Sequence, residues 1–382
     1  MENFVMYNPV KLHFGKGVID KIGKVTSGYG KRVLLVYGKG SVKKNGSYDQ
    51  VIGQLQEAGM EITEFDGIKP NPIIEDVDTA ASLGKEKQID VIVAVGGGSV
   101  IDSAKIIAIA MNYDGPAWDF IEGKAKPTLA TPLIAVLTLA ATGTEMNPTA
   151  VVQSNCALKK SGYSTPLIYP RHSFLDPTFT MSVPLNYTAY GILDLIAHAL
   201  EAWFGKGETS LTDRFIISII KDAMQHGPEL LEDLENYDLR ANIMFAATCA
   251  LNGMTHWGKK SGDWGVHLIG HCLSVAYDVP HGASLSIVYP AWLKLQKDRI
   301  PNRISELGTA LFGISEVDDV IYKIEYLFKI LQTPIRLKAI NLDVSTPEIR
   351  EKLHSVMLKN KVNGAVHKLT EEDYPKLLDL MA

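Results

Sequence analysis

Short apolar runs alternate with helical patterns through the first half of this 382-residue chain, and this alternation restricts the fold more than any other feature. We expect strands over 32–38, 60–67, 89–98 and 131–138, and helices over 47–59, 73–88 and 99–112. Strands that alternate with helices are typical of βαβ units, whose right-handed crossovers place helices on both faces of a parallel sheet.

The pattern changes near Asp176 and Pro177. Beyond Pro184 the segments are long, helical and poor in alternation, and we expect helices over 186–204, 212–227, 240–254 and 266–278. A chain of this length exceeds what one hydrophobic core usually spans. We therefore predict an α/β Rossmann-like domain over residues 1–183 and an all-helical domain over residues 184–382.

Composition excludes several classes of protein. The net charge of −5, with lysine and arginine scattered along the chain, gives no basis for a nucleic-acid surface. The sequence contains no run of about 18 apolar residues, so we expect no membrane-spanning helix. The N-terminus lacks a signal-peptide pattern. The three cysteines, Cys156, Cys249 and Cys272, are odd in number and widely spaced, which favours a reducing compartment and hence the cytoplasm. We interpret Cys272, next to His271, as a buried filler rather than a reactive thiol.

Five ligand-type residues lie in or just after two of the expected helices. Asp194 and His198 lie in the first helix, His267 and His271 lie in the second, and His281 follows it. Residues four apart project from the same face of a helix, so Asp194/His198 and His267/His271 each present two groups together. An oxygen and nitrogen donor set without cysteine suits a divalent metal such as Fe2+ or Zn2+. The alternative is a set of ordinary surface or core histidines. Spacing alone makes His267 and His271 equivalent.

Two loops predict a nucleotide site. Residues 93–105 place a glycine run between a buried strand and a helix, where backbone N–H groups and the helix dipole bind a pyrophosphate. It is not the G-x-G-x-x-G fingerprint, because Ile101 takes the place of the third glycine. Residues 138–149, after the next strand, offer Thr138, Thr142, Thr144 and Asn147 as donors. For the first loop the alternative is a tight strand–helix turn, and the second loop taken alone is a weak signal, because threonine- and glycine-containing loops are common. Together they mark the crevice at the carboxyl ends of the strands.

A third loop bears on the choice of cofactor. An NAD site often places an acidic residue near the end of a strand to bind the ribose 2′-hydroxyl. In this chain that position is occupied by a turn without an acidic residue, Gly38, Lys39, Gly40 and Ser41. Lys43 and Lys44 follow it. Such donors favour a 2′-phosphate, so we predict NADP(H) over NAD(H), with NAD(H) still possible. The alternative is a solvated basic turn.

Taken together, these motifs resemble the iron-containing (group III) alcohol dehydrogenase family. The likeness runs over nearly the whole chain, through residues 12–17, 96–105, 141–145, 194–198, 267–271 and 280–282. Residues 37–46, 235–242 and Asp263-Trp264 are most similar to its NADPH-dependent butanol dehydrogenase and aldehyde reductase branch. One departure is Ala-Ala-Thr-Gly-Thr-Glu at residues 140–145, where many members have Thr-Ala-Gly-Thr-Gly-Ser-Glu.

The resemblance implies a dehydroquinate synthase-like architecture, with a Rossmann-like domain, a helical domain and a cleft between them. It implies metal ligation by Asp194, His198, His267 and His281, and leaves His271 as a non-ligand catalytic residue near nicotinamide and substrate. It further implies a homodimer. The residues expected to bind the cofactor are Gly38, Lys39, Ser41, Asn71, Gly97, Gly98, Ser99, Asp102, Thr138, Thr142, Asn147 and Lys160.

The expected activity is reversible hydride transfer between NADP(H) and small aliphatic aldehydes or alcohols, assisted by one divalent metal. Three alternatives remain open: an NAD-dependent, glycerol-type polyol dehydrogenase; a metal-dependent lyase of the dehydroquinate synthase type; and a non-catalytic metal- or nucleotide-sensing protein. The lyase would handle anionic substrates, whereas the segments 189–204 and 261–278 carry no lysine or arginine.

Overall fold

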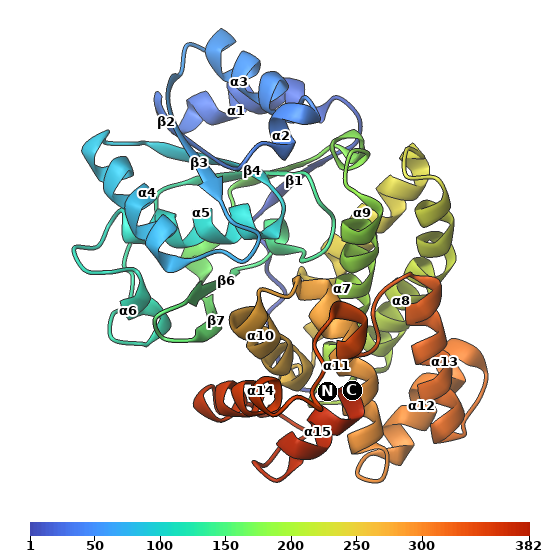
Figure 1. Ribbon diagram of the computed structural model, residues 1–382. Helices are drawn as coiled ribbons and strands as arrows, with labels where there is room; N and C mark the ends of the chain where they lie inside the picture. Colours follow the sequence, from blue (N-terminus) through green and yellow to red (C-terminus); the bar gives the residue numbers. More distant parts are fainter. The chain divides into compact units, whose positions relative to one another are not determined.

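The computed structural model describes residues 1–382, which form two compact units. The α/β unit comprises Tyr7–Val183 and Leu234–Thr248. The helical unit comprises Met1–Met6, Pro184–Asp233 and Cys249–Ala382. All strands belong to the α/β unit, and no β-strand follows residue 175 (Figure 1). The fold is thus the predicted one, a Rossmann-like unit followed by helices.

A six-stranded parallel sheet forms the centre of the α/β unit. Its order is β1-β8-β5-β4-β2-β3, and a separate antiparallel hairpin pairs β6 with β7. The strands are β1 (Lys11–Phe14), β2 (Arg32–Gly38), β3 (Glu61–Ile68), β4 (Val91–Gly96), β5 (Leu133–Leu137), β6 (Thr149–Ser154), β7 (Lys159–Ser164) and β8 (His172–Leu175).

Helices cover both faces of this sheet, as the near-continuous apolar strands require. Successive residues of a strand point to opposite faces. Leu34 therefore packs into the core beneath α4 (Ile74–Glu86) and α5 (Gly98–Ala110), whereas Leu35 packs into the core beneath α1 (Ile22–Thr26) and α3 (Ser47–Glu57). The helices of this unit are η1 (Val18–Lys21), α1 (Ile22–Thr26), η2 (Ser27–Tyr29), α2 (Ser41–Lys44), α3 (Ser47–Glu57), α4 (Ile74–Glu86), α5 (Gly98–Ala110), α6 (Trp118–Ile121), η3 (Thr144–Met146), η4 (Pro166–Ile168) and η5 (Pro177–Thr180).

Long helices build the rest of the chain. They are α7 (Leu185–Trp203), α8 (Ser210–Glu232), α9 (Tyr237–Leu251), η6 (Met254–His256), α10 (Gly265–Tyr277), α11 (His281–Gln296), α12 (Pro301–Phe312), α13 (Val317–Ile330), η7 (Leu337–Ile340), α14 (Pro347–Lys359) and α15 (Asp373–Met381). Each helix expected between 186 and 278 is present, with its ends shifted by a few residues. None of the helices is both long and apolar enough to cross a membrane.

The two compact units are not continuous in sequence. Most of α9 belongs to the α/β unit, because Phe245 packs edge-on against Phe14 and the Thr248 hydroxyl donates to Glu145 Oε1 at 2.6 Å. The first six residues belong to the helical unit, where the Glu2 amide donates to the Gly258 carbonyl at 2.9 Å. The predicted division into domains at 1–183 and 184–382 stays a prediction. Residues 1–6 and 234–248 each belong to the compact unit on the other side of that boundary.

The residue patterns do not predict β1, β8 or the β6–β7 hairpin. β1 and β8 have four residues each and pair with one another across 161 positions, Lys11 with His172. A run of four residues carries too little periodicity to identify a strand. Such strands form because a distant partner supplies their hydrogen bonds.

Candidate functional site

Three helices of the helical unit bring a carboxylate and imidazoles together. Asp194 and His198 lie one turn apart on α7, His267 lies in the first turn of α10, and His281 begins α11. Asp194, His267 and His281 each place one ligand-type atom within 4.8 Å of the other two. Asp194 Oδ1 lies 3.9 Å from His267 Nε2 and 3.7 Å from His281 Nε2. His198 adjoins this group, with Nδ1 3.6 Å from Asp194 Oδ1.

These donor atoms are better suited to binding a cation than to forming ion pairs with one another. Burial, and then the neighbouring His267 and His256, holds the pKa of His198 well below its usual value, so this imidazole is neutral at pH 7. His198 Nδ1 and His267 Nε2 are buried and make no hydrogen bond. Buried polar atoms without partners are costly. A donor set of one carboxylate and several imidazoles fits a divalent metal such as Fe2+ or Zn2+.

His271 lies one turn beyond His267 on α10 and is buried. Its ring centroid lies 5.4 Å from that of His281, but His271 does not belong to the group formed by Asp194, His267 and His281. The fold therefore separates two histidines that the spacing left equivalent. The four ligands and the catalytic role of His271 stay predictions.

Glu201, which the sequence analysis missed, also faces this cluster. It lies on α7 seven residues after Asp194 and is 1% exposed. Its Oε1 lies 2.7 Å from His267 Nδ1. A signal was present in the sequence, because residues i, i+4 and i+7 of a helix share one face. Asp194, His198 and Glu201 follow that spacing.

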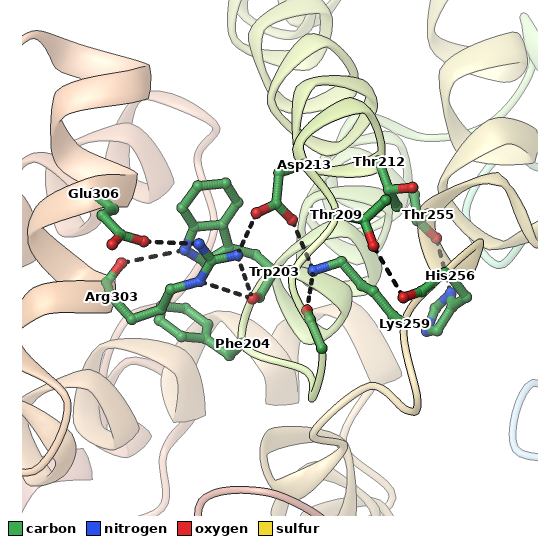
Figure 2. Close-up of polar contacts among 12 residues, drawn as sticks. Trp203, Phe204, Thr209, Thr212, Asp213, Thr255, His256, Lys259, Arg303 and Glu306 are labelled. Atoms are coloured by element: carbon green, nitrogen blue, oxygen red, sulfur yellow. Dashed lines mark hydrogen bonds and ion pairs between the residues drawn. The ribbon is translucent and has the colours of Figure 1, made fainter. Parts of the chain in front are cut away.

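A buried ion cluster holds the loop that precedes α10 (Figure 2). The Lys259 side chain is fully buried, and its Nζ lies 2.7 Å from Asp213 Oδ1. Arg303 donates to Asp213 Oδ2 at 2.8 Å and to the Trp203 carbonyl at 3.0 Å. The Arg303 guanidinium lies over the Trp203 ring, 3.7 Å from its centroid. The cluster thereby connects α8, α12 and the end of α7 to the loop.

The same loop places aromatic rings beside the imidazoles. His256 stacks on Trp264 with the ring planes 3° apart, and burial, followed by nearby Lys259, lowers the pKa of His256 to about 4. The Trp264 ring meets His198 and His267 edge-on, at centroid distances of 6.3 and 5.3 Å. A neutral, largely apolar wall therefore flanks the imidazoles on this side.

In the α/β unit, the two glycine- and threonine-bearing loops contact each other. They follow the adjacent strands β4 and β5, whose carboxyl ends meet at one edge of the sheet. A Cβ added at Gly98 would lie 2.7 Å from the Cγ2 and Oγ1 atoms of Thr142, so this approach needs glycine. No side chain caps the start of α5. Its first backbone N–H groups therefore suit a phosphate.

Lys105 supports the second loop from within the protein. Its fully buried Nζ donates to Thr144 Oγ1 at 2.7 Å, to the carbonyls of Asn147 and Thr149 at 2.8 and 2.7 Å, and to Asn147 Oδ1 at 3.1 Å. The Thr144 hydroxyl donates in turn to Asp102 Oδ1 at 2.5 Å. Asp102 and Asn147 thus bond inside the loop, and their predicted contacts with a cofactor stay predictions.

Two other predicted cofactor residues contact each other. Lys160 Nζ on β7 donates to Asn71 Oδ1 at 2.9 Å, and both side chains are buried. The Ser99 hydroxyl donates to the Pro70 carbonyl, next to Asn71 in the same β3–α4 loop. The hairpin and the glycine-rich loop therefore converge on this short segment.

The turn after β2 keeps its polar side chains at the surface. Lys39 and Ser41 are exposed, and their binding of a nucleotide phosphate stays a prediction. Lys43 makes contacts that a fully solvated lysine lacks, because its Nζ lies 5.1 and 4.7 Å from the ring centroids of Tyr37 and Tyr48. This cation–π contact fixes one positive charge near the end of β2.

The cysteines take no visible part in either site. Cys272 is buried, and burial raises the pKa of its thiol to about 12. Cys249 is buried and Cys156 is exposed. The interpretation of Cys272 as a buried filler agrees with this burial.

Sequence and structure comparisons identify relatives over the full chain. The chain is 39% identical over 387 residues to a probable NADH-dependent butanol dehydrogenase of Bacillus subtilis, covering 99% of each. It is 35% identical over 364 residues to the NADPH-dependent aldehyde reductase YqhD of Escherichia coli, covering 92% of this chain and 93% of the relative. The crystal structure of NADH-dependent butanol dehydrogenase A from Thermotoga maritima matches with a TM-score of 0.95 at 36% identity, covering 100% and 99% of the two chains.

Two family models together span nearly all of the sequence. Residues 9–177 match the model described as iron-containing alcohol dehydrogenase, and residues 188–381 match the C-terminal model of the same family. The matches confirm the expected resemblance and leave the lyase and sensor alternatives without support. The chain belongs to the iron-containing alcohol dehydrogenase family, a family of oxidoreductases that act on alcohols.

Proposed function

We propose that this protein interconverts small aliphatic aldehydes and alcohols, of the butanal and butanol type, with NADP(H) and one divalent metal. The observation that carries the proposal is the set of donors around Asp194, in which His198 Nδ1 and His267 Nε2 are buried and make no hydrogen bond. The names of the relatives, butanol dehydrogenases and an aldehyde reductase, support the substrate class.

Asp194, His198, His267 and His281 are the residues that would hold the metal. When bound, the metal polarises a carbonyl oxygen as a Lewis acid, and the reduced nicotinamide supplies the hydride. The neutral state of His198 preserves a nitrogen lone pair for coordination. We assign the proton that balances reduction of an aldehyde to the buried His271, which would relay it between the new alcohol and solvent.

The surrounding helices favour a neutral substrate. Residues 189–204 of α7 and its C-cap contain no lysine or arginine, and neither do residues 261–278 around α10. A phosphorylated substrate would need cations to offset its charge. A short apolar aldehyde needs none.

The preference for NADP(H) rests on the exposed turn after β2. Lys39 and Ser41 supply donors there, and no acidic residue occupies residues 38–46. We expect Lys39→Asp to lower kcat/KM with NADPH at least tenfold and to leave the value with NADH unchanged or raised. Lys31→Asp is the matched control, because Lys31 is exposed at the opposite end of β2. A wild type with higher kcat/KM for NADH would contradict the preference.

The decisive experiment is steady-state kinetics with an aldehyde panel and both cofactors, on protein of measured metal content. The panel includes glycerol with NAD+, which tests the polyol alternative. We expect His267→Ala to lose metal and activity together, whereas His271→Ala keeps the metal but loses rate or shifts the pH profile. A metal-free His271→Ala would show that the ligand assignment is wrong. Absence of aldehyde turnover by metal-loaded wild type would overturn the proposed function.

We further propose a cytoplasmic homodimer, as the cysteine pattern and the family resemblance led us to expect. Sedimentation at several protein concentrations tests the oligomeric state. A monomer at micromolar concentration would contradict it.

A further inference from the structure

The Glu201 carboxylate contacts the first turn of α10 at three points. Oε1 lies 2.7 Å from His267 Nδ1 and accepts from the His267 backbone N–H at 3.2 Å, and Oε2 accepts from the backbone N–H of Trp264. Glu201 is 1% exposed, so no water shell competes for its oxygens. One buried carboxylate therefore satisfies the ring and the backbone of the same histidine.

This contact decides which nitrogen of His267 carries the proton. A carboxylate accepts hydrogen bonds, so the Nδ1 of a neutral His267 bears the hydrogen and Nε2 keeps its lone pair. His267 Nε2 is the atom that lies 3.9 Å from Asp194 Oδ1, and it is buried without a hydrogen bond. The lone pair thus lies on the nitrogen nearest Asp194 before any metal binds.

The Glu201 carboxylate also constrains the backbone at Trp264. Trp264 is the N-cap of α10 and has φ 63°, in the left-handed region that a bulky residue rarely adopts. Its N–H donates to Glu201 Oε2, and the N–H of the following residue, Gly265, donates to Asp263 Oδ2 at 3.2 Å. Strained backbone of this kind persists only where surrounding contacts over-determine it.

We infer that Glu201 is a positioning residue of the metal site, which fixes the tautomer and orientation of His267. The inference rests on the proposed metal site. Partners of this kind, which hydrogen-bond the non-ligating nitrogen of a metal-bound histidine, typically change metal affinity about 10- to 100-fold when mutated. Glu201 requires no contact with substrate for this role.

The test is metal affinity, measured by chelator competition on metal-stripped protein with Zn2+ and Co2+. We expect Glu201→Ala to bind about 10- to 100-fold more weakly than wild type. Glu201→Gln should bind with intermediate affinity, because its amide oxygen still accepts from Nδ1 but carries no charge. Wild-type affinity in Glu201→Ala would overturn the inference.

Asp263→Asn is the matched control for a purely structural role. The Asp263 carboxylate also bonds the start of α10, and it accepts from the backbone N–H groups of Val366 and His367 at 2.9 and 2.7 Å. Its hydrogen-bond partners are backbone N–H groups and not an imidazole ring, so Asp263→Asn should lower the melting temperature and leave metal affinity unchanged. Equal loss of affinity in Asp263→Asn and Glu201→Ala would overturn a specific role for Glu201.

A readout without metal separates this inference from the proposed function. NMR of histidine-labelled, metal-free protein reports the tautomer of His267, assigned by comparison with His267→Ala. We expect the Nδ1–H tautomer in wild type and its loss in Glu201→Ala. If wild type shows this tautomer but binds no divalent metal, the proposed metal site fails and the positioning of His267 by Glu201 stands. If the tautomer is the same in both proteins, the role of Glu201 fails.

Discussion

Lys160 Nζ donates a hydrogen bond to Asn71 Oδ1 at 2.9 Å, although the two residues are 89 positions apart. Lys160 lies on β7 and Asn71 in the loop between β3 and α4. Both were expected to bind the cofactor, and the structure brings them together in one place. The contact orients the ammonium group of a buried lysine.

Lys160→Met should therefore weaken NADPH binding by about tenfold, the loss expected for one charge-assisted hydrogen bond. Fluorescence titration of the cofactor measures this Kd. Lys159→Met is the control, since adjacent strand residues point to opposite faces and Lys159 is more exposed. An unchanged Kd in Lys160→Met would contradict a cofactor role.

Lys105→Met should destabilise the protein by about 2–4 kcal/mol, because it leaves buried acceptors of the second loop unsatisfied. Thermal denaturation measures the loss, and Lys87→Met is the control because Lys87 is exposed. If the Kd for NADPH also rises in Lys105→Met, the conformation of this loop contributes to cofactor binding. A melting temperature equal to that of wild type would contradict the structural role.

The pH dependence of stability offers a second test of Lys105. Burial lowers the pKa of Lys105 from 10.5 to about 8. Between pH 8 and pH 10.5, Lys105 is protonated in a larger fraction of unfolded than of folded molecules. This lysine by itself therefore makes the free energy of unfolding rise with pH. The difference in unfolding free energy between wild type and Lys105→Met should therefore grow from pH 8 to pH 10. A difference that shrinks over this range would contradict the lowered pKa.

Lys259→Met should lower the free energy of unfolding by about 3 kcal/mol, because it breaks a buried ion pair. Arg303 would then be the remaining ion-pair partner of Asp213 (Figure 2). Lys260→Met is the control, because Lys260 is the exposed neighbour. The double variant Lys259→Met/Asp213→Asn should lose less than the sum of the single losses. Additive losses would show that the two residues do not interact.

Thiol reactivity should distinguish the three cysteines. An aromatic disulfide reagent at pH 8 should modify one thiol in the folded protein and three after denaturation. Cys156 is exposed, whereas Cys249 and Cys272 are buried. The raised pKa of Cys272, about 12, leaves almost no reactive thiolate at pH 8. Cys156→Ser should abolish the fast reaction, and a fast thiol remaining in that variant would contradict this assignment.

Local patterns were sufficient to predict the long elements. β2, β4 and β5 are continuous apolar runs and α7 and α10 have clear helical spacing, so each could be located from the residues alone. The four-residue strands β1 and β8 were missed because only their pairing, across the whole α/β unit, makes them strands.

The same limit applies to the site. Helical spacing determined that Asp194 shares a face with His198, and that His267 shares one with His271. It could not determine which of His267 and His271 would approach Asp194, because both lie on the presented face of α10. Only the packing of α7, α10 and α11 decided this, and it also turned the Glu201 carboxylate toward His267 Nδ1. Periodicity specifies the direction in which a side chain points, whereas its partner depends on a second element that is distant in the sequence.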